Sequence, residues 1–252
     1  MALQDSQIIA VRPNKKIYRE DDTVVKVFDP EYSKASVLNE ALNQARVEET
    51  GLNIPRILEV FKIGEKWAIR SDYIEGKTLQ QIMDENPDKQ EEYLRQFVEL
   101  QMEIHKQRAP LLTKIRDKMH RKISDSKFEA TIRFELHTRL EGMPKHKKVL
   151  HGDFNPSNVI IRPDGTPFII DWAHATQGNA SADVARTYLY LVLNGDSALA
   201  KEYLKTFCKM SDTALQYVQS WMPIVAASQS VKENNPEDFE LLSRWVNVVD
   251  YS

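Results

Sequence analysis

The sequence is poor in cysteine and glycine, and both shortages limit what the protein can be. Among its 252 residues the one cysteine is Cys208, which excludes a disulfide framework within the chain and a multi-cysteine metal site. Such low cysteine use is typical of a reducing compartment. The first of the eight glycines is Gly51, and neither a Walker A loop nor a G-x-G-x-x-G fingerprint is present. A P-loop NTPase and a dinucleotide oxidoreductase are therefore disfavoured, and the lack of G-x-S-x-G likewise disfavours a serine hydrolase.

An excess of one charge and long apolar runs are also missing. Lysine and arginine number 34 against 37 aspartates and glutamates, whereas a nucleic-acid-binding protein usually has a strong basic excess. No stretch approaches the roughly 20 apolar residues that span a membrane. The N-terminal segment lacks the apolar core of a signal peptide. We therefore expect a cytoplasmic protein that binds neither nucleic acid nor a membrane, and its oligomeric state stays open.

The first 74 residues have the pattern of an antiparallel sheet with one helix. β-branched and aromatic residues predict strands, and "TVVKVF" at 23–28 is the strongest of them. The other expected strands lie at 7–11 and 15–19 around Pro13 and Asn14, and in "IPRILEVF" and "KWAIRSDYI". Helical spacing at 33–49 predicts a helix that Ser33 or Ser36 caps.

The pattern changes after "DYIEGKTL", and the rest of the chain is mainly helical. Expected helices lie at 88–107, 111–124, 127–141, 182–193, 197–209, 212–231 and 236–247. One β element interrupts them, a hairpin in which "NVIIR" and "PFII" flank the turn signal "PDG". The sequence thus predicts an α+β fold with a small antiparallel β-rich lobe at 1–74 and a larger helical lobe at 75–252.

Acids and amides gather on both sides of this hairpin. "HGDFNPSN" at 151–158 precedes it, and Asp171 follows it in "PFIIDW". Turn chemistry alone explains such residues in loops. However, a hairpin returns Asn158 and Asp171 to the same end, and Mg²⁺ prefers such hard oxygen ligands. Asp153, earlier on the loop, is placed to accept a hydroxyl proton. His151 has no second histidine near it and is interpreted as a structural hydrogen-bonding residue.

A phosphate site also needs a positive charge, and Lys26 is the candidate. It lies in the middle of "VVKVF", where most lysines simply face solvent. Glu40 lies on the following predicted helix, and its carboxylate would pair with Lys26 if that helix packed over the sheet. Glu40 is otherwise a plausible solvated charge.

These elements together resemble a known superfamily. "HGDFNPSN" has the H-x-D-x-x-x-x-N spacing of a kinase catalytic loop, and "IIDW" stands where protein kinases carry D-F-G. The H-G-D form and the Trp after the Asp resemble the aminoglycoside phosphotransferase and choline kinase-like superfamily. The resemblance runs from about residue 7 to 195. It implies a bilobal protein-kinase-like fold that uses ATP and Mg²⁺ to phosphorylate a hydroxyl of a small molecule.

The resemblance also implies a role for each candidate side chain. Asp153 would be the catalytic base or would position the acceptor hydroxyl, and Asn158 and Asp171 would be the Mg²⁺ ligands. Lys26 would contact the α and β phosphates and would be held by Glu40.

Two further roles follow from the resemblance. The segment Ser71, Asp72, Tyr73 and Ile74 would be the hinge whose backbone binds adenine. Asp183 would brace the catalytic loop from a helix, and a first-turn helix acid is an equally good interpretation.

Several questions stay open at this point. The first hairpin has no glycine, so the groups that cover the phosphates are unknown, and Asn14, Lys15 and Lys16 at its tip are interpreted as solvated turn residues.

The alternatives to a small-molecule kinase are a nucleotide-binding pseudokinase, a protein kinase and a metal-dependent hydrolase. No A-P-E segment of a protein kinase is evident. The acceptor could be an aminoglycoside, a sugar or an amino alcohol, because a fold does not define a substrate.

Overall fold

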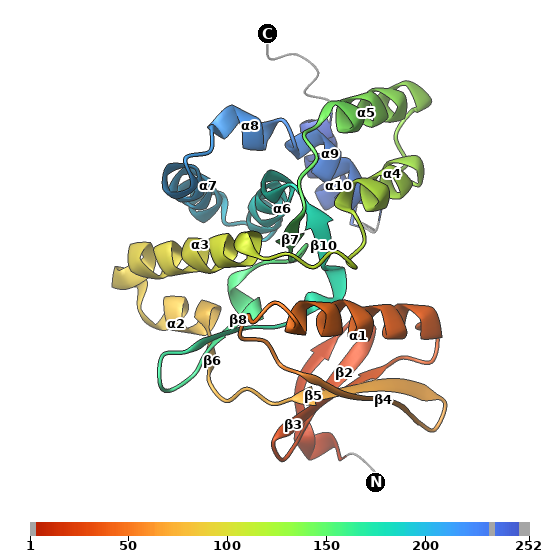
Figure 1. Cartoon of the computed structure of the whole chain (residues 1–252), viewed down its shortest axis with the longest axis vertical. Coiled ribbons are helices and arrows are strands. Elements are labelled where there is room, and N and C mark those ends of the chain that lie inside the picture. Colours follow the sequence, from red (N-terminus) through yellow and green to blue (C-terminus); the bar gives the residue numbers. More distant parts are fainter. Residues whose placement is uncertain (1–3, 232–234, 247–252) are drawn as a thin grey trace. The chain divides into compact units, whose positions relative to one another are not determined.

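The computed structural model describes residues 4–231 and 235–246. Contacts divide the chain into two compact units, each formed by two segments (Figure 1). Met1–Asp88 and Pro156–His174 form the β-rich unit, and Lys89–Asn155 and Ala175–Ser252 form the helical unit. The hairpin that follows the catalytic-loop motif thus makes its contacts within the β-rich unit. The functional division into lobes at 1–74 and 75–252 stays a prediction.

The larger of the two sheets in the β-rich unit is five-stranded and antiparallel, in the order β1-β2-β3-β5-β4. Its strands are β1 (Ile8–Arg12), β2 (Lys15–Glu20), β3 (Thr23–Phe28), β4 (Ile57–Ile63) and β5 (Lys66–Asp72). A 3₁₀ turn at Asp5–Gln7 precedes them. All five expected strands are present within three residues of the predicted ends, because the β-branched runs and the turn signals lie close together in sequence.

Helix α1 (Lys34–Glu48) covers one face of this sheet. The Ser33 hydroxyl accepts a hydrogen bond from the Ser36 amide at 3.1 Å, which confirms the predicted N-cap. Val37 and Ala41 of the helix pack with Phe28 and Ile69 of the sheet. The face that carries Phe28 is therefore removed from water by α1.

A second, three-stranded sheet belongs to the same unit and runs in the order β6-β8-β9. Its strands are β6 (Lys77–Thr78), β8 (Val159–Ile161) and β9 (Pro167–Ile169), so the predicted hairpin is present.

Helix α2 (Leu79–Glu85), which was not predicted, begins at a capping box between Thr78 and Gln81. The T-x-x-Q spacing was its signal in the sequence. Short 3₁₀ turns lie at Pro87–Lys89, Pro156–Asn158 and Trp172–His174.

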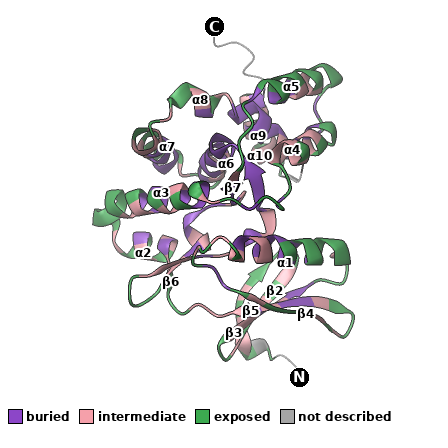
Figure 2. Cartoon of the chain, viewed as in Figure 1, coloured by how far each residue is buried: buried purple, intermediate pink, exposed green. Residues whose placement is uncertain are grey.

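The helical unit contains one two-stranded sheet among its helices. Strands β7 (Lys148–Leu150) and β10 (Thr176–Gly178) pair antiparallel. The helices are α3 (Gln90–Lys106), α4 (Ile115–Ser124), α5 (Ala130–Gly142), α6 (Ala180–Leu193), α7 (Ser197–Ser211), α8 (Leu215–Gln219), α9 (Met222–Ser230) and α10 (Pro236–Val246). Most residues of α6 and α9 are buried, so these two helices form the centre of the unit (Figure 2).

The prediction of one helix at 212–231 was wrong, because two helices, α8 and α9, occupy this stretch. Pro223 lies in the first turn of α9, and a proline has no amide hydrogen to donate to the carbonyl four residues earlier. It is tolerated at a helix start but would interrupt a continuous helix. The predicted last helix is present as α10, and its expected final residue, 247, lies outside the described residues.

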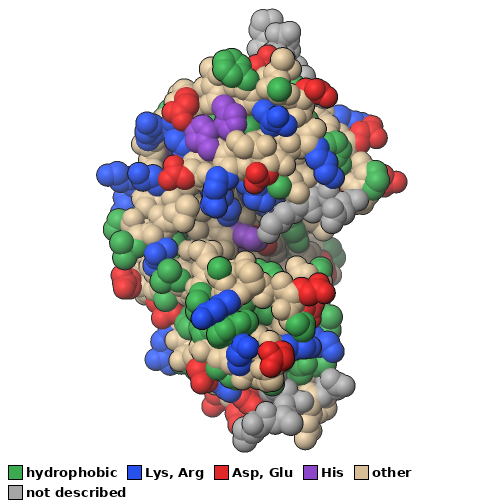
Figure 3. Space-filling model, turned by 90° about the vertical axis from the view of Figure 1, so that its right-hand side faces the viewer, with side chains coloured by type: hydrophobic (Ala, Val, Ile, Leu, Met, Phe, Trp, Pro, Cys, Tyr) green, Lys and Arg blue, Asp and Glu red, His purple; other side chains and the backbone are tan. Residues whose placement is uncertain are grey.

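A histidine pair joins α4 and α5. Figure 3 shows histidine side chains among the charged side chains on one face of the molecule. The Nδ1 atoms of His120 and His137 are 2.8 Å apart, and the ring planes differ by 12°. His120 Nε2 lies 2.6 Å from the Glu141 carboxylate, and His137 Nε2 lies 3.2 Å from the Ser124 hydroxyl.

Over 4–231 and 235–246, no helix combines the length and the apolar character needed to cross a membrane.

Candidate active site

Lys26 faces α1 rather than solvent, and the sheet register explains why. Side chains alternate between the two faces of a strand, so Lys26 shares a face with Phe28, which α1 covers. The Lys26 ammonium lies 2.9 Å from the Glu40 carboxylate, and both side chains are largely buried. The predicted ion pair between Lys26 and Glu40 is therefore present.

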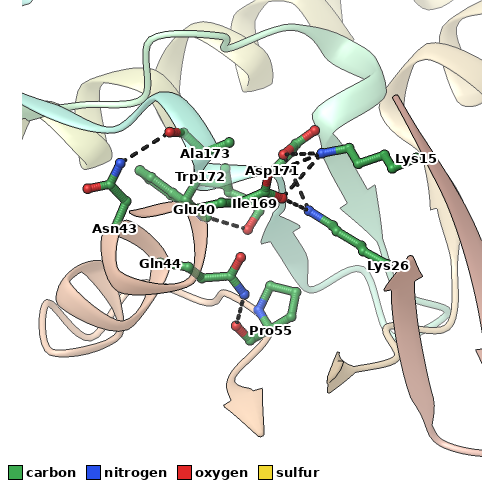
Figure 4. Close-up of polar contacts among 10 residues, drawn as sticks. All are labelled: Lys15, Lys26, Glu40, Asn43, Gln44, Pro55, Ile169, Asp171, Trp172 and Ala173. Atoms are coloured by element: carbon green, nitrogen blue, oxygen red, sulfur yellow. Dashed lines mark hydrogen bonds and ion pairs between the residues drawn. The ribbon is translucent and has the colours of Figure 1, made fainter. Parts of the chain in front are cut away.

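Two amide side chains of α1 hold the helix, and with it Glu40, in place. Asn43 Nδ2 donates to the Ala173 carbonyl at 3.1 Å, and Gln44 Nε2 donates to the Pro55 carbonyl at 2.6 Å. Figure 4 shows both contacts beside the charged cluster. The orientation of Glu40 thus depends on contacts that α1 makes with the Pro55 segment and with Ala173, which lies 130 positions from Asn43.

Asp171 completes the charged cluster. Its Oδ1 atom lies 3.3 Å from Lys26 Nζ, although 145 residues separate the two in sequence. The backbone of Asp171 adopts φ = 64°, a left-handed conformation that is unusual for a residue other than glycine. Such strain, roughly 1–3 kcal/mol, persists only where the surroundings impose it and is frequent at functional sites.

The hairpin β8–β9 brings Asn158 and Asp171 to the same end, as the sequence predicted. Val159 pairs with Ile169, and the Ile170 amide donates to the Asn158 carbonyl at 2.9 Å. Asn158 and Asp171 therefore flank one closed hairpin. A carboxylate and a carboxamide are both hard oxygen donors, so this pair fits Mg²⁺ chemically.

Lys15 is a fourth member of the cluster, and the interpretation of Lys15 as a solvated turn residue was wrong. Its side chain is only 15% exposed, as is that of Lys26. Lys15 Nζ lies 3.2 Å from Glu40 and 3.8 Å from Asp171, and Figure 4 shows both lysines reaching toward these acids. The misjudgement arose because a hairpin tip is usually solvated, whereas here the Lys15 ammonium reaches Glu40 of α1 and Asp171.

The cluster keeps Lys26 fully charged. Burial opposes the ammonium form, but the carboxylates of Asp171 and Glu40 outweigh this effect and raise the pKa of Lys26 far above its ordinary value. Two lysines and two acids balance to zero net charge. The side chains are thus arranged as a buried electrostatic network rather than a single pair.

The first five residues of the catalytic-loop motif, 151–155, lie in the helical unit and form a network of their own. Asp153 Oδ1 lies 3.2 Å from Arg186 Nη2, and the two side chains are each 27% exposed. Sequence reasoning did not identify Arg186 as a functional residue. Its only signal was its position three residues after Asp183 on the helix that the resemblance assigns to the catalytic loop.

Asp183 braces the catalytic loop through the loop backbone. Its carboxylate accepts the Gly152 amide at 2.7 Å and the His151 amide at 3.3 Å, and it lies 3.0 Å from His105 Nε2. Burial alone would raise the pKa of Asp183, but the hydrogen bond from His105, the electrostatic effect of the His105 and His151 rings and the Gly152 amide outweigh it and lower the pKa. Asp183 is also a first-turn acid of α6, so both interpretations made from the sequence hold.

The predicted hinge is already partly occupied by hydrogen bonds of the chain itself. The Asp72 amide donates to the Arg56 carbonyl at 3.1 Å, and the Tyr73 amide donates to the Asp22 carbonyl at 2.9 Å. The Asp72 carboxylate also pairs with the Arg56 guanidinium. Ser71, at 7% exposure, lies within β5. Binding of adenine by Ser71 to Ile74 stays a prediction.

Solved structures of small-molecule kinases are similar to this chain. A thermostable mutant of aminoglycoside phosphotransferase APH(4)-Ia has a TM-score of 0.69 at 16% identity, over 95% of this chain and 91% of that one. The choline kinase LicA from Streptococcus pneumoniae has a TM-score of 0.65 at 15% identity, over 95% and 92%. Aminoglycoside-3'-phosphotransferase of type VIII has a TM-score of 0.62 at 14% identity, over 85% and 88%. These likenesses confirm the predicted bilobal protein-kinase-like fold.

The chain belongs to the phosphotransferase enzyme family, whose pattern it matches over residues 10–220. A search of curated protein sequences finds no match. Family membership confirms the resemblance read from "HGDFNPSN" and "IIDW", and it confirms the prediction of a phosphotransferase.

Proposed function

We propose that the protein transfers the γ-phosphate of ATP, in a Mg²⁺-dependent reaction, to a hydroxyl group of a small molecule. The observation that carries this proposal is the convergence of Lys26, Glu40 and Asp171, with Lys26 Nζ at 2.9 Å from Glu40 and 3.3 Å from Asp171. A lysine held between a helix acid and an acid after a hairpin matches the parts that kinases use for phosphoryl transfer. Among the similar structures, one APH(4)-Ia structure is a ternary complex with AMP-PNP and hygromycin B, and one LicA structure contains AMP.

In this proposal the chain supplies charge and position. Lys26 binds the phosphates of ATP, and Glu40 keeps the lysine extended along the covered face of the sheet. Asn158 and Asp171 hold Mg²⁺, which neutralises phosphate charge when it is bound. The hinge contributes backbone groups to adenine, and since the amides of Asp72 and Tyr73 are engaged, we assign this contact to Ile74.

Asp153 acts on the acceptor. The hydroxyl oxygen forms a bond to the γ-phosphorus while the bond from that phosphorus to the bridging oxygen breaks, so ADP leaves with the bridging oxygen. The hydroxyl proton passes to the Asp153 carboxylate. Arg186, 3.2 Å from Asp153 Oδ1, fixes one carboxylate oxygen so that the other meets the hydroxyl.

An aminoglycoside, a sugar and an amino alcohol all remain acceptors within the proposal. Each presents hydroxyl groups, and a screen of such compounds with radiolabelled ATP measures the transfer directly. Purified protein should transfer phosphate to at least one compound in the presence of Mg²⁺ and lose the activity in a chelator. Nucleotide binding without any transfer would instead favour the pseudokinase alternative, and phosphorylation of protein substrates alone would favour a protein kinase.

Three variants test the division of labour among the acids. Asp171→Ala should lose Mg²⁺-dependent nucleotide affinity and transfer together. Asp153→Asn should bind Mg·ATP nearly as the wild type does and lose transfer by roughly 10²–10⁴-fold, the scale of a general base. Asp164→Asn is the matched control, because this exposed carboxylate lies in the turn of the same hairpin. Loss of nucleotide affinity in Asp153→Asn as severe as in Asp171→Ala would contradict the assignment.

A further inference from the structure

We propose that Lys15 is a second phosphate-binding lysine, which takes the place of the glycine-rich loop that this chain lacks. The proposal rests on the proposed function, since it assumes that the cluster around Lys26 binds ATP. It assigns to Lys15 a direct contact with the polyphosphate. The sequence had left the groups that cover the phosphates unknown.

The first hairpin cannot bind phosphate with its backbone in the usual way. A phosphate-binding loop needs several free amides and glycines that let the backbone approach the anion. Pro13 at the turn has no amide hydrogen, and the chain has no glycine before Gly51. The turn carbonyl of Asn14 also accepts a hydrogen bond from the Asp29 amide at 3.0 Å, which ties the tip to the end of β3. A positive charge at this place must therefore come from a side chain.

The register of β2 on β3 puts Lys15 where that charge is needed. Ile17 lies opposite Lys26, and Lys15 lies opposite Phe28, so Lys15 and Lys26 are diagonal neighbours on the face that α1 covers. Lys16 lies opposite Val27 and points to the other face, where it is exposed. The two adjacent lysines thus have opposite environments.

The charges of the cluster leave one ammonium group for the phosphates. Lys15 and Lys26 share Glu40, at 3.2 Å and 2.9 Å, and both approach Asp171, at 3.8 Å and 3.3 Å. When Asp171 serves as a metal ligand, Glu40 is the acid that remains to the two lysines. One carboxylate balances one ammonium, so the remaining positive charge is neutralised by a phosphate oxygen of the nucleotide. Such charge-assisted contacts are the strong ones in anion binding.

Calorimetric affinities of Lys15→Met and Lys16→Met test the inference. Each variant is titrated in Mg²⁺ with a non-hydrolysable ATP analogue and with adenosine, which has no phosphate. We expect Lys15→Met to bind the ATP analogue about 10- to 100-fold more weakly, the range that one hydrogen bond to a charged group provides. Adenosine affinity should not change, and Lys16→Met should match the wild type for both ligands.

A purely structural role for Lys15 would give a different result, because damage to the sheet would weaken adenosine and the ATP analogue alike. Lys15→Arg, which keeps the charge, should recover most of the affinity lost in Lys15→Met, and a thermal melt of each free variant verifies folding. Equal affinity of Lys15→Met and the wild type for the ATP analogue would overturn the inference and leave the proposed function intact. Failure of the wild type to bind the analogue would overturn both.

Discussion

The buried carboxylate of Asp183 should be essential to the stability of the catalytic loop. In Asp183→Asn the side chain keeps its shape, but an amide group replaces one of the two acceptor oxygens. One carboxylate oxygen of Asp183 accepts the Gly152 amide at 2.7 Å. The other accepts the His151 amide at 3.3 Å and lies 3.0 Å from His105 Nε2, so the amide group faces donors at either position. At least one buried donor therefore loses its acceptor and meets another donor.

The magnitude follows from the number and burial of these contacts. An unsatisfied buried donor costs about 1–3 kcal/mol. Because Asp183 is 2% exposed and at least one of its donors loses its acceptor, we expect the free energy of unfolding to fall by about 1–3 kcal/mol. Urea unfolding at pH 7 measures this loss. Amide hydrogen exchange adds a local readout, since the Gly152 amide should lose its protection.

The control is Asp196→Ala, which removes the N-cap of α7. Asp196 accepts the Leu199 amide at 2.9 Å, so this variant should lose only about 1 kcal/mol and should leave the Gly152 amide protected. The pKa of Asp183 is lowered in the folded state, so its contribution is present above the unfolded pKa and is lost as the pH falls through the folded pKa. The stability difference between wild type and Asp183→Asn should therefore narrow below about pH 4. A loss under about 1 kcal/mol with an unchanged Gly152 amide would refute the bracing role.

Three further outcomes are expected. Arg186→Ala should leave calorimetric Mg·ATP affinity unchanged and lower turnover by about 10- to 100-fold, because Asp153 loses the partner at 3.2 Å that orients it; unchanged turnover would argue against this. The pKa of His137 is lowered by burial and by the nearby His120 and Arg133, so the unfolded chain binds the proton at a higher pH than the folded chain does. The free energy of unfolding should therefore decline as the pH falls from about 7 through 6, and urea unfolding of His137→Gln should show a shallower decline. In Gly76→Ala the new Cβ would lie 2.2 Å from the Ile161 carbonyl oxygen, so the melting temperature should fall well below that of Gly64→Ala, where no atom lies within 4 Å; equal melting temperatures would contradict the steric argument.

The sequence predicted the features that depend on short stretches of chain. The strands β1 to β5, the cap of α1 at Ser33 and the hairpin that returns Asn158 and Asp171 to one end all follow from local patterns. The family resemblance was also local, because the spacing of "HGDFNPSN" and "IIDW" carries it. A missed local signal was Pro223, which divides α8 from α9.

The tertiary structure decided which charged side chains meet. Lys15 and Lys16 are adjacent and identical, and only the register of β2 on β3 and the covering helix α1 make one of them buried and the other exposed. The contact of Lys26 with Asp171 joins residues 145 positions apart, and that of Arg186 with Asp153 joins a helix to a loop 33 positions earlier. Such contacts depend on how whole elements pack, and no local pattern in the sequence records that packing. The sequence could therefore name Asp153, Asp171 and Lys26 from their motifs, whereas Lys15 and Arg186 became visible only when the chain was folded.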